Sequence, residues 1–139
     1  MGLNCSHGAW DGPYSKFNRF RQYVGKACGG SFPPHDAEFV ERYRAETGEE
    51  PDARDVIWDD EVIPADLLRG GKTFLEHSDC DGEISPADCI HVARFLRWAA
   101  PLMPAAGSAR GPDDPQAWAE RFASGCDRAA MAGEPLTFG

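Results

Sequence analysis

The stretch that decides the expected fold is SPADCIHVARFLRWAA, residues 85–100. Ser85 is a typical N-cap, Pro86 suits the first position of a helix, and Asp88 places an acid at the third position. The apolar residues that follow cover most of the circumference of a helix and leave a narrow polar edge, formed by His91, Arg94 and Arg97. We therefore predict a helix that runs to about Ala100 and lies at the centre of the core.

Helical spacing of apolar residues predicts further helices before and after this one, at residues 15–27, 34–47, 66–76 and 115–132. Ser15 is the expected N-cap of the first helix, and Gly48 is the expected C-cap of the second. The second helix also places Glu38 four residues before Arg42, a spacing that allows an ion pair along the helix. These signals predict a chain that is helical over most of its length.

The remaining segments predict turns and little strand. Gly70 and Gly71 would weaken or split the third helix, and residues 107–115 form a Gly-, Pro- and Asp-rich loop that is the best candidate for a mobile segment. The run DVIWDDEVIP, residues 55–64, permits a short hairpin around Asp59 and Asp60 or an extended passage, and the tail adds a short strand or packs Phe138 on the core. We predict a mainly α fold: one compact domain, residues 1–139, built as a bundle of about five helices with at most a short hairpin or a C-terminal strand.

Length and charge limit the function classes. The chain has 139 residues, a length that suits one domain. Its formal net charge of −9 disfavours general nucleic-acid binding. No apolar run reaches the roughly 20 residues that cross a bilayer, so we expect no membrane partner. The N-terminus lacks a secretory signal pattern, so we expect a cytoplasmic protein.

The charge is divided unevenly along the chain. Residues 12–35 contain no acid and carry four basic side chains, Lys16, Arg19, Arg21 and Lys26. Residues 36–63 contain eleven acids against three arginines. A local positive patch on an acidic body suits a small anion better than a long polyanion, because the body would repel a duplex. The alternative is a solvated basic helix that pairs with its own acidic neighbour.

The turn HSDCDGEI, residues 77–84, resembles half of an EF-hand calcium loop. Alternate acids in a tight turn direct oxygens inward, and Gly82 permits the sharp bend. His77 is an unsuitable first ligand, and the final acid is shorter than the bidentate Glu that calcium prefers. The candidate calcium ligands are Asp79, Asp81, Glu83 and Asp88. The alternative is a capped turn between two helices whose acids are solvated.

The five cysteines are an odd number, so we expect reduced thiols, with Cys28, Cys89 and Cys126 buried in helices. A zinc site is a second metal hypothesis, because Cys5 with His7 and His77 with Cys80 supply four ligands if the N-terminus folds back on the turn. The same residues allow a Cys–His dyad for a small nucleotide hydrolase. The alternative is that they hydrogen-bond the turn to the N-terminal segment.

Two motifs resemble a known family. CSHGAWDGPYSKFNRFR, residues 5–21, and LEHSDCDGEISPADC, residues 75–89, resemble a family of short proteins of bacteria and their phages that has no assigned activity. The closing GEPLTF is loosely similar, whereas residues 30–69 show no similarity. The resemblance implies a bacterial host cell and one site formed by Cys5, Ser6, His7, Tyr14, Asn18, Arg19, His77, Asp79 and Cys80.

The function that we expect is non-enzymatic binding of a small polar or phosphorylated ligand, such as a nucleotide. Lys16 and Arg19 would supply charge, Asn18 and His77 hydrogen bonds, and Trp10 or Tyr14 a stacking surface. In a phage-type protein, the biological role of such binding would be that of a sponge, a protein that sequesters a nucleotide immune signal. The alternatives are a regulatory module that binds Ca or Zn, an acidic inhibitor that binds a protein, and the small nucleotide hydrolase. The sequence is compatible with a homodimer and contains nothing that indicates one.

Overall fold

The computed structural model describes residues 2–58, 61–78 and 81–139. The described part is mainly α, as the sequence predicts, with helices α1 (Tyr14–Ala27), α2 (Ala37–Thr47), α3 (Leu68–Glu76), α4 (Pro86–Ala99) and α5 (Pro115–Ala132). Short 3-10 turns cover Ser6–Gly8, Ala65–Leu67 and Ala100–Leu102. None of the described helices has the length and apolar character that crossing a membrane requires.

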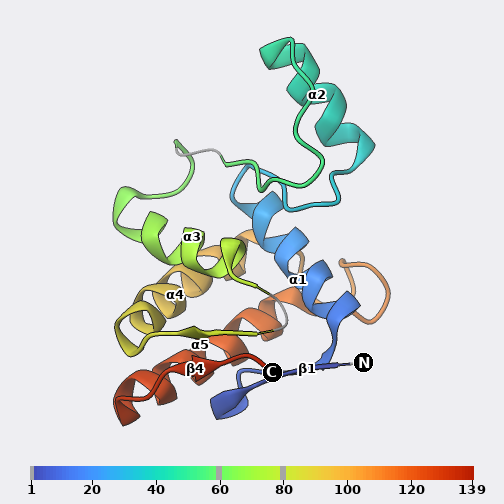
Figure 1. The fold of residues 1–139 in the computed structure, drawn as a ribbon. Helices are drawn as coiled ribbons and strands as arrows, with labels where there is room; N and C mark the ends of the chain where they lie inside the picture. Colours follow the sequence, from blue (N-terminus) through green and yellow to red (C-terminus); the bar gives the residue numbers. More distant parts are fainter. Residues whose placement is uncertain (1, 59–60, 79–80) are drawn as a thin grey trace.

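Helix α4 lies between α3 and α5 and contributes to the core along its length (Figure 1). Its start is the predicted one, because the Ser85 hydroxyl accepts a hydrogen bond from the Asp88 amide and Pro86 opens the helix. Contrary to expectation, the glycine pair in α3 does not interrupt that helix. A Cβ at Gly70 would lie 2.1 Å from the His91 carbonyl oxygen, so glycine there allows α3 to approach α4 closely.

Two other helix starts differ from their predictions. Helix α1 begins at Tyr14 with Pro13 as the N-cap, so the prediction of Ser15 as the cap is wrong. Helix α2 begins later than predicted because Asp36 caps it and accepts a 2.7 Å hydrogen bond from the Phe39 amide. The predicted C-cap at Gly48 is confirmed, with φ at 73°.

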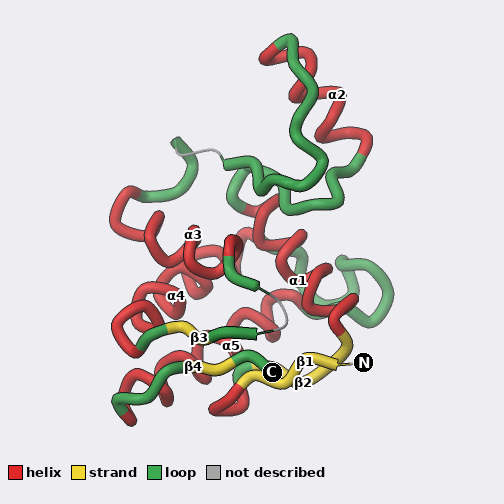
Figure 2. The backbone as a smooth tube through the Cα atoms, in the orientation of Figure 1, coloured by secondary structure: helices red, strands yellow, loops and turns green. Residues whose placement is uncertain are grey.

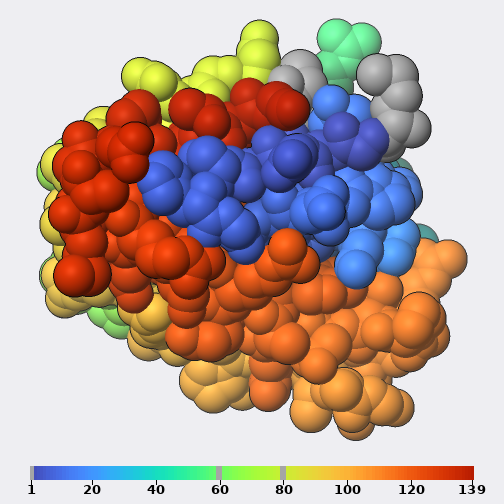
Figure 3. Space-filling model, turned by 90° about the horizontal axis from the view of Figure 1, so that it is seen from below, coloured from blue at the N-terminus to red at the C-terminus, as the bar shows by residue number. Residues whose placement is uncertain are grey.

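Two short antiparallel strand pairs lie beside the helices (Figure 2). The first joins β1 (Gly2–Cys5) to β2 (Trp10–Pro13), a hairpin that the sequence analysis does not predict. The second joins β3 (Glu83–Ile84) to β4 (Leu136–Thr137), which confirms the strand expected in the tail. A bridge between Cys5 and Phe138 connects the pairs, so the N-terminal segment lies against the C-terminal tail (Figure 3).

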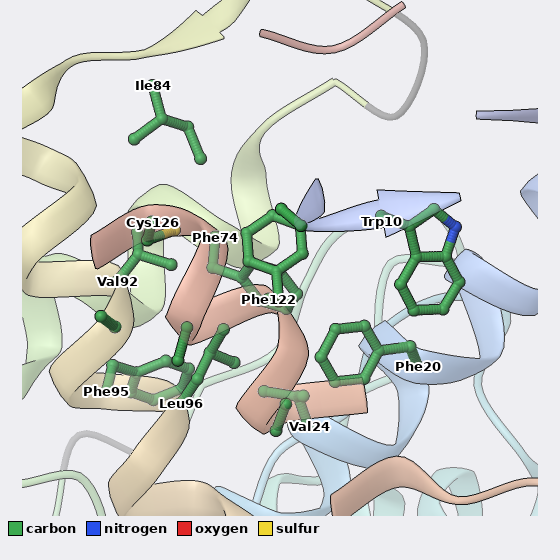
Figure 4. Packing of buried hydrophobic residues seen from close by; sticks show 14 of the residues in the cluster. Trp10, Phe20, Val24, Phe74, Ile84, Val92, Phe95, Leu96, Phe122 and Cys126 are labelled. Carbon is green, nitrogen blue, oxygen red and sulfur yellow. The ribbon is translucent and has the colours of Figure 1, made fainter. Parts of the chain in front are cut away.

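The core is rich in aromatic rings, several of which are fully buried: Phe17, Phe20, Phe74, Phe95 and Phe122. The Trp10 ring is 3% exposed and stacks on Phe20 with ring centroids 5.5 Å apart (Figure 4). Aromatic pairs of this kind add about 0.5–1.5 kcal/mol each to the stability that burial provides. The N-terminal hairpin is thus fixed to α1 through the core.

Helix α2 projects beyond the other helices, and Phe39 is its only buried residue (Figure 1). The chain that returns from α2 is joined to the chain that enters it by two backbone hydrogen bonds between Ser31 and Ile57, of 2.9 and 3.0 Å. Ile57 therefore pairs across the base of this projection, and not within the predicted hairpin at 55–64. The turn of that hairpin, Asp59 and Asp60, lies outside the described residues.

Candidate ligand-binding site

A cavity of about 430 Å³ lies between α1 and α2, and we call it the α1–α2 cavity. Its floor is the turn that joins the two helices, and Arg110 from the loop before α5 closes one side. The volume is at the small end of the range for small-molecule sites, roughly 300–1,000 Å³. Its lining combines basic side chains, Arg19, Lys26, Arg42 and Arg110, with aromatic rings, Tyr23, Phe32 and Phe39.

Among the described residues, three of the four cations in the cavity form no ion pair, although the charge of Arg110 helps to lower the pKa of the nearby Asp113 carboxyl. Within residues 2–58, 61–78 and 81–139, no carboxylate lies within ion-pairing distance of Lys26, Arg42 or Arg110, and all three side chains are exposed. The predicted pairing of Glu38 with Arg42 is therefore absent. The Arg42 guanidinium instead lies over the Phe39 ring, 5.4 Å from its centroid. Its charge remains available to a ligand.

The fourth cation, Arg19, is bound to Asp113. The guanidinium donates two hydrogen bonds, Nε to Oδ2 at 3.0 Å and Nη2 to Oδ1 at 3.1 Å. The Tyr23 hydroxyl donates a third to Oδ2, and Asp113 is 3% exposed. Hydrogen bonding to Arg19 is the main cause that lowers the pKa of the Asp113 carboxyl. Because its charge is already paired, Arg19 contributes less to an anion than the sequence analysis expects.

This pairing also positions Arg110. The Tyr23 hydroxyl accepts a 3.0 Å hydrogen bond from the Arg110 amide, so the loop is fastened to α1 at both Arg110 and Asp113. We expected mobility in residues 107–115, and these bonds restrain that segment. They also place the Arg110 side chain at the cavity.

The wall formed by α2 is held by His35. Its Nδ1 lies 2.7 Å from the Ser31 hydroxyl, and its Nε2 lies 2.9 Å from the Asp52 carbonyl oxygen. Below it, a Cβ at Gly30 would lie 2.0 Å from the Ile57 carbonyl oxygen, so only glycine fits at that crossing. The turn at 29–34 is therefore packed tightly between α1 and the returning chain.

The predicted N-terminal site residues lie away from this cavity. The Ser6 hydroxyl accepts a hydrogen bond from the Thr137 amide, and His7 Nε2 lies 3.4 Å from Glu134. Cys5 is 1% exposed. These residues bind the N-terminal segment to the C-terminal tail, which is a structural role.

The residues expected to stack on a ligand or to supply charge, Trp10, Tyr14 and Lys16, also lie outside the α1–α2 cavity. Trp10 is buried in the core and offers no face to a ligand. The Lys16 ammonium lies 5.1 Å from the centroid of the Trp118 ring, outside the lining of the cavity. Tyr14 is partly buried against the core. None of the three lines the α1–α2 cavity.

Asn18 and His77 do come together, in a second and more open groove of about 670 Å³ that also contains Arg21 and Trp58. The His77 ring stacks on Phe138, with centroids 4.2 Å apart. Its Nδ1 lies 2.7 Å from the Ser78 carbonyl oxygen and its Nε2 lies 3.1 Å from that of Glu83. A neutral ring donates to only one of these carbonyl oxygens, and either bond uses its single N–H, which leaves His77 poorly suited to donate to a ligand.

The metal hypotheses gain no support from the described residues. Asp88 pairs with Arg69 at 2.7 Å, and Glu83 lies in β3, where it pairs with Thr137. Asp81 is exposed, whereas Asp79 and Cys80 lie outside the described part of the chain. Within that part, no group of three His, Cys, Asp or Glu side chains is arranged to hold a metal ion.

The described cysteines are free and buried. Cys89 and Cys126 lie within α4 and α5 as expected, whereas Cys28 is the C-cap that follows α1. Burial raises the pKa of the Cys5 thiol, and separately that of Cys28, to about 12. A thiol that stays protonated at neutral pH is a poor nucleophile. A dyad that uses Cys5 is therefore disfavoured, and Cys80 lies outside the described residues.

Sequence reasoning missed most of the α1–α2 cavity. Lys26 belonged to the predicted basic patch, but Arg42, Arg110 and the aromatic rings were not singled out. The available signal was the run GGSFPP at 29–34, which forces a tight turn between two predicted helices. Comparison with family models, with curated proteins and with solved structures found no match to the chain.

Proposed function

We propose that this protein binds a small anionic ligand, of the phosphorylated class, in the α1–α2 cavity. The observation that carries the proposal is the set of three cations, Lys26, Arg42 and Arg110, that line one cavity and form no ion pair with a described residue. Like charges that face one space repel each other, and a bound anion converts that repulsion into attraction. Each cation comes from a different segment, so the fold itself gathers them.

The surroundings suit a small ligand better than a polymer. The net charge of −9 repels a long polyanion, whereas a compact anion interacts mainly with the nearest side chains. The cations in the lining outnumber its two acids, Asp36 and Glu38. The Asp36 carboxylate caps α2 by accepting the Phe39 amide, and Glu38 is exposed at the rim.

We propose binding without catalysis. The described thiols are buried, and the Asp113 carboxylate is paired with Arg19, so none of these groups is a free nucleophile or base at the cavity. Retention of the ligand is then the whole activity, which fits the proposed role of a protein that sequesters a small signal.

Calorimetric titration with inorganic pyrophosphate at low salt tests the proposal. Loss of one charge-assisted hydrogen bond costs about 1.5–3 kcal/mol, so R42A and K26A should each bind about tenfold more weakly or worse. The matched controls are R44A, which removes the cation that Glu50 pairs on the same helix, and K72A on α3. The proposal would be contradicted if R42A and R44A lost the same amount of affinity for pyrophosphate, or if the unmodified protein did not bind it.

A further inference from the structure

The aromatic half of the α1–α2 cavity points to the chemistry of the ligand. We infer that the ligand joins a flat, hydrogen-bonding ring to its anionic group, as a nucleoside monophosphate does. This inference rests on the proposed function and narrows it to one ligand class. Three observations of the cavity lead to it, and each concerns a different part of the lining.

The first observation is the position of Phe32. It lies on the floor of the cavity and is only partly buried, and the guanidinium of Arg21 lies 5.5 Å from its ring centroid. Phe32 thus lines the α1–α2 cavity and also the second groove, on whose side Arg21 lies. Aromatic rings on the floor of a cavity offer a stacking surface to a planar group, and such stacking is a general mode of base recognition.

The second observation is the pairing of Arg42 with Phe39. The guanidinium lies over the Phe39 ring, 5.4 Å from its centroid, and both residues line the cavity. A guanidinium held in this way both carries charge and offers a flat surface on which a ring can stack. A simple phosphate would use only the charge of this arrangement.

The third observation is the acid at the rim. Glu38 lines the cavity beside the cations, and no partner within ion-pairing distance neutralises it among the described residues. An acid in this place weakens the binding of bare phosphate. It accepts hydrogen bonds from the amino group of a base or from sugar hydroxyls, so it favours a ligand that carries donors as well as charge.

The size of the cavity limits the ligand further. A volume of about 430 Å³ suits one nucleotide, and the acidic body of the protein disfavours a longer strand. The Lys26 and Arg110 side chains would bind the phosphate. Phe32 and Arg42 would stack with the ring, and the Glu38 carboxylate would accept hydrogen bonds from the ligand's N–H or O–H groups.

Calorimetric titrations with four probes separate this inference from the proposed function. The probes are AMP, ribose 5-phosphate, adenosine and inorganic pyrophosphate, each with the full chain at the same low salt. The inference predicts that AMP binds at least about tenfold more tightly than ribose 5-phosphate, because a stacked base adds that much. Equal affinity for AMP and ribose 5-phosphate overturns the inference and leaves anion binding intact. Adenosine that binds as well as AMP overturns anion binding, and no binding of any probe overturns both.

A ring-specific variant adds a second readout. F32L keeps an apolar side chain on the floor and removes the flat surface, so AMP should bind about tenfold more weakly while ribose 5-phosphate is unaffected. The matched control is Y43L, because Tyr43 is an aromatic residue of α2 that does not line the cavity. Thermal unfolding of each variant shows whether it is folded. If F32L misfolds, the ratio of the two affinities in the unmodified protein still decides the question.

Discussion

Arg19 donates two hydrogen bonds to Asp113, and this pair fastens the loop before α5 to the surface of α1. The two residues are far apart in the sequence, and Asp113 is almost fully buried. The sequence analysis assigned Arg19 to a ligand. The structure gives the guanidinium a partner within the chain. The pair thus holds the loop that carries Arg110 beside the α1–α2 cavity.

We predict that D113N destabilises the folded protein at neutral pH by about 1–3 kcal/mol, because it leaves the partly buried Arg19 guanidinium and the Tyr23 hydroxyl poorly satisfied. Urea unfolding of both proteins measures this difference. The control is D66N, whose carboxylate forms an exposed pair with Arg94 and should contribute little.

We also predict that the stabilisation provided by the Asp113 carboxylate depends on pH. Its pKa in the folded state is lowered, chiefly by Arg19, so the stabilisation is complete above the unfolded pKa of about 3.9 and is lost as the pH falls through the folded value. The stability gap between the unmodified protein and D113N should therefore narrow below about pH 4. A gap that stays constant from pH 7 to pH 3 would contradict this account of Asp113.

Because α3 packs closely on α4, we predict that a side chain at Gly70 strongly destabilises the protein. A Cβ at Gly70 would meet the His91 carbonyl oxygen at 2.1 Å, so G70A should separate the helices and cost about 1–3 kcal/mol or more. The control is G12A, whose added Cβ would meet no atom closer than 3.6 Å. Thermal unfolding compares the two, and equal melting temperatures would refute the packing argument.

Burial predicts which thiols resist modification. The pKa of Cys5 and that of Cys28 are each about 12, so at pH 8 almost no reactive thiolate is present at either residue. Treatment of the folded protein with iodoacetamide, followed by peptide mass spectrometry, should leave both unmodified. The same treatment in urea should modify them, and rapid labelling of Cys5 in the folded state would show that the N-terminal hairpin opens.

The helices could be predicted because their signals are local. Ser85, Pro86 and Asp88 mark the start of α4 within four residues, and the structure has that start. The hairpin of β1 and β2 was missed because its strands contain Gly and Pro, and its turn uses His7 at a φ of 58° in place of the usual glycine. Local propensity argues against such a turn, and contacts with α5 and the tail override it.

The candidate site was harder to predict because its residues come from distant segments. Lys26, Arg42 and Arg110 belong to α1, α2 and a loop, and only the fold brings them to one cavity. The motifs around residues 5–7 and 77 are more distinctive as sequence. The structure uses their polar groups to join the two ends of the chain, as the hydrogen bond from the Thr137 amide to Ser6 shows.

The most direct test of the central claim is an NMR titration of the ¹⁵N-labelled protein with inorganic pyrophosphate at low salt. Anion binding in the α1–α2 cavity predicts amide shifts at Lys26, at the turn 29–34 and at Arg110, and these shifts should saturate together. Shifts confined to residues 5–7 and 77–78, or no saturable shift at all, would contradict the account.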